Sequence, residues 1–542
     1  MSQRLRLVSL GWRRVQVLLA VAHQPRPAPE TLRLRRHGTN VLAHPTGWSI
    51  EGDTLVLRFN VFQGPHQEPL DRGRWTLVSA TSGRRPTITG VTIDSAPIVP
   101  PTARAEFVVA TDSLYIATAS VDSASGRFHL DIEVLDLESR VPIDPRQRYG
   151  TGTVGRAVHM LLRPRLAVFT LLFRLFRIVA RRNGRRILFS SDSRAALGGN
   201  LRLVFDRMVE RGLDREYELQ TLFKDGIVSS RALRDRFRLP WLLARADAIV
   251  IDDYHPVIYR LQEPHVRIVQ LWHAVGAFKT VGYSRVGRPG APNPYGIVHK
   301  NYSHAIVSSI EDVPVYAEAY GIPESRVFPT GVPRVDLFFD PGYRERALAQ
   351  VETAIPARNG RFTMLFAPTF RGDGARTATF DFGKLDLATL HALCVEKDAR
   401  CLVKMHPFVR ERLEIPPEFC DRIIDLSDSP IDVNDLLFAV DLLITDYSSI
   451  VFEYSTLGRP MLFYAYDLEE YIASRDFYEP YEAFVPGRIV RTFDELVDAI
   501  RRADYQQDRV EAFARRHFDH LDGGSTDRVI DLITAALAEG PR

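Results

Sequence analysis

Two histidines of this chain follow short apolar runs that are typical of buried β-strands. His273 comes two residues after the run 266–271, and His406 comes three residues after the run 401–403. The pKa of an unperturbed imidazole lies near neutrality, so a histidine at the end of a strand can accept a proton from a hydroxyl nucleophile or donate one. The sequence therefore indicates acid–base chemistry at these two positions. Taken singly, each histidine is also compatible with a structural role in a loop.

Hydroxyl and cationic side chains follow other predicted strands in the second half of the chain. Thr369 and Arg371 come after the run 362–367, and Lys404 stands two residues before His406. Cationic side chains next to hydroxyl donors are suited to an anionic ligand. We therefore expect an anion-binding site at the ends of these strands.

A further group, Asp446-Tyr447-Ser448-Ser449, follows the run 441–445 at the predicted start of a helix. The first N–H groups of a helix have no partner within the helix, and they lie at the positive end of its dipole. Together with the serine hydroxyls, they would bind a phosphate or a diphosphate. The same residues would also cap the helix, and both functions can be served at once.

Neither a P-loop nor a nucleotide-bound metal is indicated by the sequence. The chain contains no Walker A sequence, which disfavours a P-loop NTPase. Asp252-Asp253 is the nearest candidate for an acidic metal-binding pair, and we interpret it as a strand-end cap. Since histidines and arginines can neutralise a diphosphate without a cation, we expect no metal and no other cofactor.

The elements that must position these residues alternate between strand and helix from residue 186 onward. The predicted strands include 186–190, 246–251, 266–271 and 304–308, and then 362–367, 401–405, 441–445 and 460–464. Short apolar strands separated by helices predict parallel sheets, and two such sets predict two doubly wound domains, 186–340 and 341–542. Ligands of such domains bind at the carboxyl ends of the strands, between the domains.

Residues 1–150 are β-rich and predict a separate domain. The runs 54–61, 74–78, 113–118 and 128–134 are rich in β-branched or aromatic residues, and turn-rich stretches separate them. Their spacing fits a small sandwich or barrel. An accessory module that binds an acceptor and a module that only packs against the rest of the chain both remain open.

Residues 151–185 predict a basic amphipathic linker helix. Apolar side chains recur every three or four residues from Leu166 to Val179. No acidic residue occurs between Asp144 and Asp192, and nine arginines of this gap are Arg156, Arg163, Arg165, Arg174, Arg177, Arg181, Arg182, Arg185 and Arg186. Because basic amphipathic helices lie in the headgroup region of anionic leaflets, we expect residues 156–186 to contact an anionic membrane surface. The alternative is an inter-domain helix whose apolar face packs on protein.

Composition limits the class of protein. Of the 542 residues, 45% are hydrophobic and 25% are charged, which excludes a disordered chain, a fibre and a polytopic membrane protein. Residues 1–380 carry 52 basic and 35 acidic side chains, whereas residues 381–542 carry 18 and 32. This asymmetry indicates either an anionic partner for the basic part or mutual attraction between domains. Three cysteines without metal-ligand spacing fit a reducing cytoplasm.

Seven sequence blocks occur in order along the chain. They are Gln270-Leu271-Trp272-His273, Thr330-Gly331-Val332-Pro333-Arg334-Val335-Asp336, Ala367-Pro368-Thr369-Phe370-Arg371, Lys404-Met405-His406-Pro407, Thr445-Asp446-Tyr447-Ser448-Ser449, Arg459-Pro460 with Tyr466-Asp467-Leu468-Glu469-Glu470-Tyr471, and Asp522-Gly523-Gly524-Ser525-Thr526-Asp527-Arg528. With these blocks the chain resembles the CDP-glycerol glycerophosphotransferase family, the teichoic-acid polymerases and primases, over roughly residues 186–535. The resemblance implies an α/β fold in which two Rossmann-like domains form a GT-B pair, here preceded by the β-rich domain. It also implies a peripheral location at the cytoplasmic face of the cell membrane.

The resemblance further implies the transfer of a polyol phosphate to a hydroxyl of a lipid-linked acceptor, with release of CMP. The implied donor is CDP-glycerol or CDP-ribitol, with glycerol phosphate expected first, and no nucleic-acid partner is implied. His273 would be the general base, and His406 would hold or protonate the diphosphate bridge. Trp272, Lys279 and Arg334 are implied on the acceptor side. The residues implied to bind the donor are Thr369, Arg371, Lys404, Asp446, Ser448, Ser449, Glu453, Asp522, Gly523 and Ser525.

The chain departs from the family pattern directly after the first histidine. Ala274-Val275-Gly276 stands where family members commonly have glycine, threonine and proline, and this loop shapes the acceptor side. The identity of the acceptor is therefore left open. Two other functions stay open as well: a GT-B glycosyltransferase that uses a nucleotide sugar, and a non-catalytic protein that binds or scaffolds a surface polymer.

Overall fold

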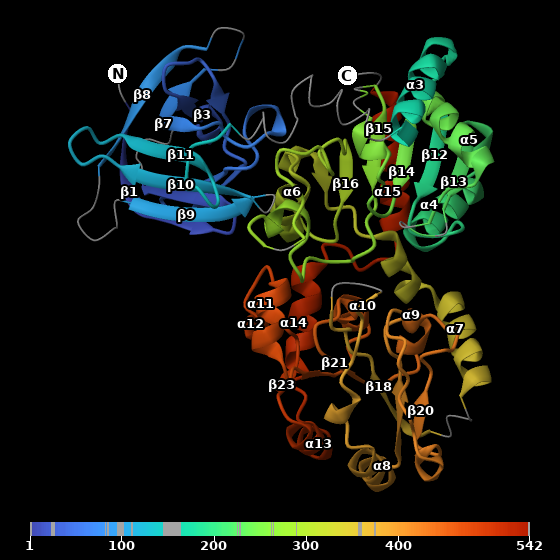
Figure 1. Cartoon of the computed structure of the whole chain (residues 1–542). Coiled ribbons are helices and arrows are strands. Elements are labelled where there is room, and N and C mark those ends of the chain that lie inside the picture. Colours follow the sequence, from blue (N-terminus) through green and yellow to red (C-terminus); the bar gives the residue numbers. More distant parts are fainter. Residues whose placement is uncertain are drawn as a thin grey trace.

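The computed structural model divides the chain into three parts. It describes residues 3–539 except 23–27, 82, 84–85, 95–101, 110–111, 145–163, 225, 227–228, 262, 264, 289, 356–359 and 373–375. A β-module, residues 3–144, lies beside a first α/β domain, and a second α/β domain lies below the first in the view of Figure 1. Among the described residues, no helix has the length and hydropathy needed to cross a bilayer.

The β-module is a sheet of eleven strands that encloses one hydrophobic core. Its strands are β1 (Gln3–Arg13), β2 (Gln16–Ala22), β3 (Leu32–Arg36), β4 (Leu42–Ala43), β5 (Gly47–Glu51), β6 (Thr54–Asn60), β7 (Gly73–Ala80), β8 (Ile88–Asp94), β9 (Thr102–Val109), β10 (Ser113–Val121) and β11 (Phe128–Asp136). They pair in the order β5-β6-β2-β1-β8-β7-β11-β10-β9, with β3 and β4 attached beside β7. Leu19 and Leu57 from one end of this order share a core with Tyr115 and Ile132 from the other end. The expected β-rich N-terminal part is thereby confirmed.

The first α/β domain is built on a sheet of six parallel strands. These are β12 (Arg186–Ser191), β13 (Glu218–Phe223), β14 (Ala248–Ile251), β15 (Arg267–Gln270), β16 (His304–Ile306) and β17 (Val327–Phe328). Their order is β13-β12-β14-β15-β16-β17, and the chain direction across the sheet reverses between β12 and β14. The helices are α4 (Gly199–Glu210), α5 (Leu233–Arg245) and α6 (Val313–Tyr320). Both faces of strands such as β14 are buried, which is why they consist of continuous apolar runs.

The second α/β domain repeats this architecture with the strand order of a Rossmann fold. Its parallel strands are β18 (Phe362–Phe366), β19 (Ala399–Val403), β20 (Ile423–Asp425), β21 (Leu442–Thr445), β22 (Met461–Tyr464) and β23 (Arg488–Val490), in the order β20-β19-β18-β21-β22-β23. The helices are α7 (Pro341–Ala354), α8 (Leu387–Glu396), α9 (Val433–Leu437), α10 (Ile450–Ser455), α11 (Leu468–Arg475), α12 (Tyr481–Phe484), α13 (Phe493–Arg502) and α14 (Asp508–His517). The predicted pair of Rossmann-like domains in a GT-B arrangement is confirmed.

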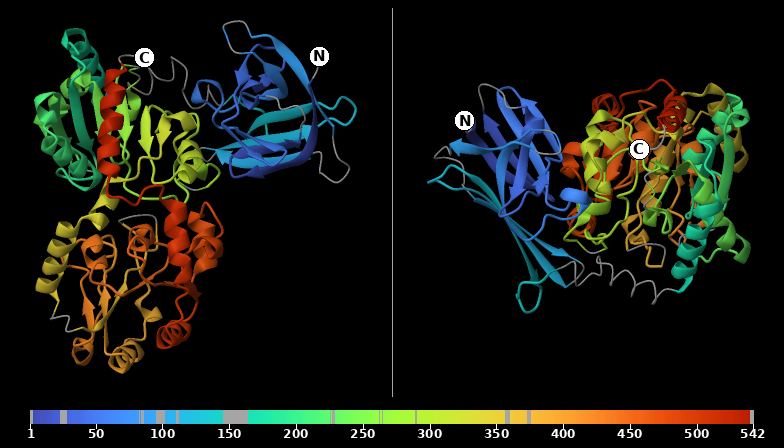
Figure 2. Two further views of the ribbon diagram at one scale, coloured as in Figure 1. Left: turned by 180° about the vertical axis from the view of Figure 1, so that it is seen from behind. Right: turned by 90° about the horizontal axis from the view of Figure 1, so that it is seen from above.

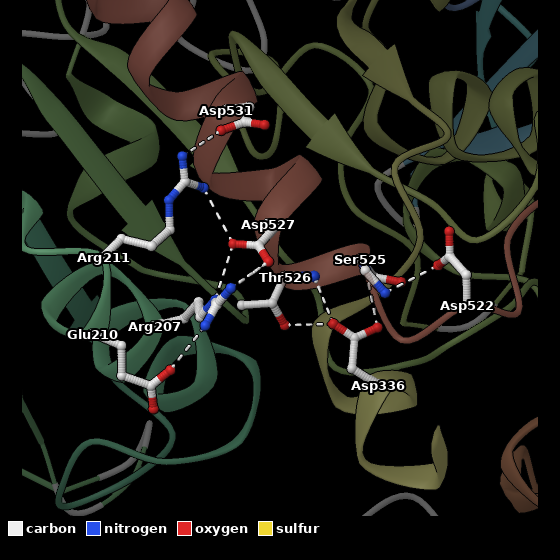
Figure 3. Close-up of polar contacts among 10 residues, drawn as sticks. Arg207, Glu210, Arg211, Asp336, Asp522, Ser525, Thr526, Asp527 and Asp531 are labelled. Atoms are coloured by element: carbon white, nitrogen blue, oxygen red, sulfur yellow. Dashed lines mark hydrogen bonds and ion pairs between the residues drawn. The ribbon is translucent and has the colours of Figure 1, made fainter. Parts of the chain in front are cut away.

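The last helix, α15 (Ser525–Ala538), returns to the first domain, which differs from the predicted division at residue 341. Val529, Ile530 and Ile533 pack into the core of the first sheet, and both views of Figure 2 and Figure 1 place α15 against that sheet. Ion pairs of Asp527 with Arg207 in α4 and with Arg211, the residue after α4, reinforce the contact (Figure 3). Sequence periodicity identifies a helix but does not say which of two similar sheets it covers.

The predicted linker helix is α3 (Pro164–Val179), and it packs on protein. Phe173 is buried in the core of the first domain, and Phe176 contacts Trp241 of α5 edge to face with ring centroids 5.3 Å apart. The apolar face expected to meet a membrane therefore covers α5 instead. A different row of α3 is exposed: Val168, Leu171, Leu175 and Ile178. Arg156 and Arg163 lie outside the described residues.

Candidate functional site

His273 follows β15 after a left-handed turn at Trp272. The φ of Trp272 is 54°, a conformation that costs a non-glycine residue free energy and persists where neighbouring bonds hold it. The side chain of Gln270 accepts a hydrogen bond from the Trp272 N–H at 2.9 Å, and the side-chain amide of Asn200 donates one to the Trp272 carbonyl at 2.8 Å. These bonds fix the turn that presents His273, half of whose side chain is exposed.

Asp253 is the carboxylate that faces His273. One of its oxygens lies 3.7 Å from Nδ1 of the imidazole, and the same oxygen accepts a hydrogen bond from the Tyr254 N–H at 2.7 Å. Desolvation by the surrounding protein lowers the pKa of His273; Asp253 opposes this shift, whereas the positive charge of Arg334 adds to it. The lowered pKa keeps the imidazole neutral at pH 7, which is the form that a general base requires.

The loop that follows this histidine inserts into the second domain. Val275 and Phe278 belong to the hydrophobic core of that domain, and Phe278 stacks on Phe484 with centroids 4.4 Å apart. Gly276 is a point of close approach, because a Cβ there would lie 2.3 Å from the ring of Phe452. A larger residue at position 276 would force the two domains or the ring to move.

A buried ion pair between the domains lies next to this loop. Arg334, in the 3-10 helix Pro333–Phe339, places a guanidinium nitrogen 2.6 Å from a carboxylate oxygen of Glu453 in α10. The carboxylate is almost wholly buried, so removing one partner would leave a buried charge uncompensated. Arg334 was expected on the acceptor side and Glu453 on the donor side, and the structure pairs them with each other.

Thr369 and Asp446 meet where the strand order of the second sheet reverses, between β18 and β21. The Thr369 N–H donates to Asp446 at 2.7 Å, and Asp446 is buried. The hydroxyl of Thr369 is also buried and has no hydrogen-bond partner among the described residues. Since ligands of doubly wound sheets bind at this reversal point, the Thr369 hydroxyl is available to one.

Arg371 is held by two carboxylates, which differs from the expected direct contact with a donor. Its guanidinium binds both oxygens of Asp467 at 2.6 and 2.8 Å and one oxygen of Asp446 at 2.9 Å. Three tyrosine rings, Tyr447, Tyr466 and Tyr471, surround it at 5.1–5.4 Å. Arg371 thus spends most of its N–H groups on carboxylates of its own domain, and its expected contact with a donor stays a prediction.

Lys404 uses two of its three donors within the protein, whereas Nε2 of His406 has no hydrogen-bond partner among the described residues. The Lys404 ammonium donates to the carbonyls of Leu426 and Ser429 at 2.9 and 2.7 Å. Nδ1 of His406 accepts from the Phe408 N–H at 3.2 Å, which assigns the proton of a neutral ring to Nε2. Burial lowers the pKa of His406, and the charge of a nearby lysine, Lys279, lowers it further. His406 can therefore donate a hydrogen bond from Nε2.

Lys279 comes from the first domain but lies in the site of the second. Its ammonium is 3.3 Å from the hydroxyl of Tyr471, and its backbone forms an isolated β-bridge with Phe477. Burial lowers the pKa of Lys279 to about 8, and the charge of Asp446 limits the shift. Six residues after His273, it supplies a positive charge close to Asp446 and His406.

The two serines at the start of α10 are half-buried. Ser448 accepts a hydrogen bond from the Ile450 N–H at 3.4 Å, whereas Ser449 makes no side-chain cap bond. Both follow β21 at the reversal point of the second sheet. Their hydroxyls, like that of Thr369, can face a ligand bound there.

The C-terminal block is placed away from the second sheet. Asp336 accepts hydrogen bonds from the N–H groups of Ser525 and Thr526 at 3.0 and 2.7 Å, which caps α15 (Figure 3). Hydrogen bonds from Arg528 and from the Gly524 N–H hold the pKa of Asp522 at about 2. Gly523, with a φ of 71°, forms the turn before this helix. These contacts give Asp522, Gly523 and Ser525 a structural role at the start of α15.

A second polar cluster lies where the strand order of the first sheet reverses, between β12 and β14. Asp192 after β12 binds Arg231 and lies 3.3 Å from His255, and Asp252 after β14 pairs with Arg194 at 2.7 Å. Burial raises the pKa of Asp252 to about 6, although Arg194 counteracts it. Asp252-Asp253 is thus divided: the first carboxylate pairs with an arginine and the second faces His273.

Several residues of the site were not predicted from the sequence. Asp253 was interpreted only as a cap, and Asn200, Asp467 and Tyr471 were not assigned roles. Asp467 and Tyr471 stand in one of the quoted blocks, which is the only signal that could have identified them. Among the described residues, no group of three or more histidine, cysteine or acidic side chains could hold a metal ion.

Comparison with known proteins finds similarity to enzymes of teichoic-acid synthesis. The family model described as CDP-Glycerol:Poly(glycerophosphate) glycerophosphotransferase matches residues 171–535. The teichoic acid ribitol-phosphate polymerase TarK of Staphylococcus aureus is 43% identical over 431 residues, which cover 78% of this chain and 82% of that protein. The teichoic acid glycerol-phosphate primase of Bacillus subtilis is 28% identical over 298 residues, or 54% and 74% of the two chains.

A solved structure shares the fold. The wall teichoic acid polymerase TagF superposes with a TM-score of 0.57 at 22% sequence identity, and the match covers 73% of this chain and 99% of that one. The arrangement of two Rossmann-like domains is therefore that of a known protein.

The contact between Asp253 and His273 predicts the effect of removing the carboxylate. In Asp253→Asn the pKa of His273 falls further, because the negative charge that stabilises the imidazolium is lost. An NMR titration of histidine-labelled protein would measure it, with the His273 signal assigned by its absence from His273→Ala. Asp206→Asn, an exposed carboxylate of α4, is the control and leaves this pKa unchanged. An unchanged pKa in Asp253→Asn would contradict the proposed contact.

Proposed function

The chain belongs to the CDP-Glycerol:Poly(glycerophosphate) glycerophosphotransferase family, and from this premise we propose that it transfers a polyol phosphate onto an acceptor hydroxyl in teichoic-acid synthesis. It is a CDP-polyol phosphotransferase. The observation that carries the proposal is the position of His273. It ends a strand of the first sheet, faces Asp253, and stands on a loop that inserts into the second domain beside the residues of β18 and β21.

In the proposed reaction, His273 removes the proton from an acceptor hydroxyl. The hydroxyl oxygen attacks the phosphorus that carries the polyol and forms a phosphodiester bond. The bond from this phosphorus to the oxygen of CMP breaks, and CMP leaves with the electron pair. Such transfers depend mainly on positioning and on stabilisation of negative charge. His406 and Lys279 are the groups suited to the second task.

The proposed donor site is the reversal point of the second sheet. The hydroxyls of Thr369, Ser448 and Ser449 and the Nε2–H of His406 donate no hydrogen bond within the described part of the chain, so they are proposed donors for the diphosphate. Lys279 adds a cation from the first domain. Arg371 and Lys404 use most of their donors on carboxylates and backbone carbonyls, which they order.

Ribitol phosphate is the polyol phosphate that the relatives favour. Over the aligned residues, the ribitol-phosphate polymerase of Staphylococcus aureus is 43% identical to this chain, and the glycerol-phosphate primase of Bacillus subtilis is 28% identical. We therefore propose CDP-ribitol as the preferred donor, although the family resemblance led us to expect glycerol first. A nucleotide-sugar transferase and a non-catalytic scaffold are less consistent with the family match and with the pairing of His273 and Asp253.

The proposed acceptor is lipid-linked and is reached at an anionic membrane surface on the cytoplasmic side. Arg177 and Arg182 of the basic segment pair with Glu263, so they are not free for lipids. Three other arginines of this segment are exposed and have no carboxylate partner among the described residues: Arg174, Arg181 and Arg185. With the exposed apolar row of α3, they support a peripheral contact with anionic headgroups.

Replacement of the proposed base tests the mechanism. His273→Ala lowers turnover by about 10²–10⁴-fold, the usual contribution of general-base assistance. Release of CMP is followed with the purified full chain, and the melting temperature shows that the variant stays folded. His265→Ala, an exposed histidine before β15, is the control and keeps wild-type turnover. Near-wild-type turnover in His273→Ala would remove this histidine from the reaction.

A panel of donors tests the substrate class. With a lipid-linked acceptor, CDP-ribitol gives the highest kcat/KM, CDP-glycerol a lower one, and UDP- or GDP-sugars none, as measured by nucleotide release. Release of UDP or GDP would instead support a glycosyltransferase. Binding of the acceptor without any release of nucleotide would support a scaffold.

Binding to vesicles tests the membrane contact. Each arginine near an anionic surface contributes about 1 kcal/mol, so Arg174→Ala, Arg181→Ala and Arg185→Ala together weaken partition into anionic vesicles by roughly 100-fold. Sedimentation with vesicles at low and high salt measures it. The matched control replaces three exposed arginines of other helices, Arg346, Arg502 and Arg515, and has little effect. Equal weakening in both triple variants would contradict a contact through α3.

A further inference from the structure

We propose that a cavity between α3, α5 and the loop after β14 binds the lipid end of the acceptor, a hydrocarbon chain that ends in a phosphate or diphosphate. The inference rests on the proposed function and names a subsite for its acceptor. The cavity has a volume of about 680 Å³. This volume is within the range of sites that enclose small ligands.

Most of the cavity wall is hydrocarbon. Its apolar lining consists of Val168, Phe169, Leu172, Leu233, Phe237, Leu239, Pro256 and Val257. Three of these side chains are largely exposed, with 69% of Leu233 and 53% each of Val168 and Phe237 open to solvent. Contiguous exposed apolar side chains are unfavourable in water and mark an interaction site. A hydrocarbon chain entering between α3 and α5 would cover them.

The cavity also carries positive charge that the protein does not neutralise. Arg236 and Arg260 line it, and neither has a carboxylate partner among the described residues. Arg260 donates to the hydroxyl of Tyr259 at 2.7 Å and Arg236 to the carbonyl of Arg231 at 3.0 Å, which leaves further N–H groups on each guanidinium. Guanidinium groups suit the oxygens of a phosphate. An apolar cavity with two such groups matches an anionic amphiphile.

The place of the cavity in the fold links it to the reaction. Its wall includes Arg231, which binds Asp192 after β12, and Tyr254, which follows β14, so it lies at the reversal point of the first sheet. Ligands of doubly wound sheets bind at this point. The residue before Tyr254 is Asp253, which faces His273. One loop therefore forms both the cavity wall and the partner of the base.

Other occupants fit these observations less well. A nucleotide would leave the apolar wall unused, and an amphipathic peptide helix would leave the two arginines unpaired. A bilayer phospholipid shares the chemistry of the acceptor lipid, so the experiment must separate the two. The acceptor is favoured because the cavity borders the loop of Asp253 and not only the outer face of α3.

The test compares two acceptors with the same polyol end, one carrying a long isoprenyl diphosphate and one without lipid. Val257→Trp fills the cavity, and we expect at least a tenfold rise in KM for the lipid-linked acceptor. Turnover of the lipid-free acceptor stays at the wild-type value, which also shows that the variant is folded. Val209→Trp, an exposed valine of α4, is the control and changes neither.

The two arginines of the cavity are tested against an arginine that does not line it. Arg236→Ala together with Arg260→Ala raises the KM for the lipid-linked acceptor, whereas Arg234→Ala, on α5 like Arg236, does not. Equal losses for both acceptors, or no loss for the lipid-linked one, would overturn the proposal. An unchanged KM for the lipid-linked acceptor in Val257→Trp would also overturn it.

Direct labelling separates this proposal from the proposed function. A long-chain alkyl phosphate carrying a diazirine is crosslinked to the full chain, and the proposal predicts adducts at Leu172, Phe237 or Val257 that the isoprenyl-linked acceptor displaces. These adducts form whether or not any CDP-polyol is turned over. Displacement by phospholipid vesicles but not by the acceptor would assign the cavity to bilayer lipid, and adducts elsewhere would refute it.

Discussion

The contact of Gly276 with Phe452 is the constraint on which the geometry of the site depends. Because a Cβ at position 276 would lie 2.3 Å from the Phe452 ring, the loop after His273 can approach the second domain only with glycine there. The same loop places Val275 and Phe278 in the core of the second domain and Lys279 beside Tyr471. The proposed base of one sheet and the proposed donor groups of the other are thus positioned by packing, and the buried pair Arg334–Glu453 adds a second contact between the domains.

The distribution of charge in the second domain explains why this insertion matters. That domain is acidic, and its cation at the reversal point, Arg371, is bound by Asp446 and Asp467. Lys404 donates to backbone carbonyls. An anionic diphosphate bound there would therefore meet neutral donors such as the Thr369 hydroxyl, together with Lys279, a cation that the first domain inserts. For the proposed donor, both domains would then contribute to the electrostatics of the site.

Much of the fold could be predicted from the sequence, because its signals are local. Apolar runs such as 246–251 and the resemblance of the seven blocks predicted the parallel strands and the GT-B pair, and the β-rich runs predicted the first module. The placement of α15 could not be predicted, since Val529 and Ile533 would fit either of two similar sheets. The face of α3 that meets protein was also not predictable, because the helix is apolar on more than one side.

The sequence predicted which strand ends carry the residues of the candidate site. It did not predict which of these side chains are already paired with other residues of the protein. Residue type does not reveal that Arg371 is bound by two carboxylates or that Asp253 lies 3.7 Å from His273. These facts depend on contacts between residues far apart in the chain. Asp336, which caps α15 from 189 residues away, is a further example of a partner that no local pattern indicates.

The asymmetry of charge between the two halves has two physical origins. Arg207 and Arg211 of the basic half bind Asp527 and Asp531 of the acidic C-terminal helix, so part of the asymmetry is mutual attraction within the chain. Several arginines of α3, α5 and their neighbouring loops behave differently, although Arg177 and Arg182 pair with Glu263. Arg174, Arg181, Arg185, Arg236 and Arg260 have no carboxylate partner within the described part of the chain. Arginines without a carboxylate partner in the described ranges are available to an anion from outside, and several of them flank the apolar cavity and the exposed row of α3. The proposed phosphate-bearing lipid would match both the charge and the apolar surface.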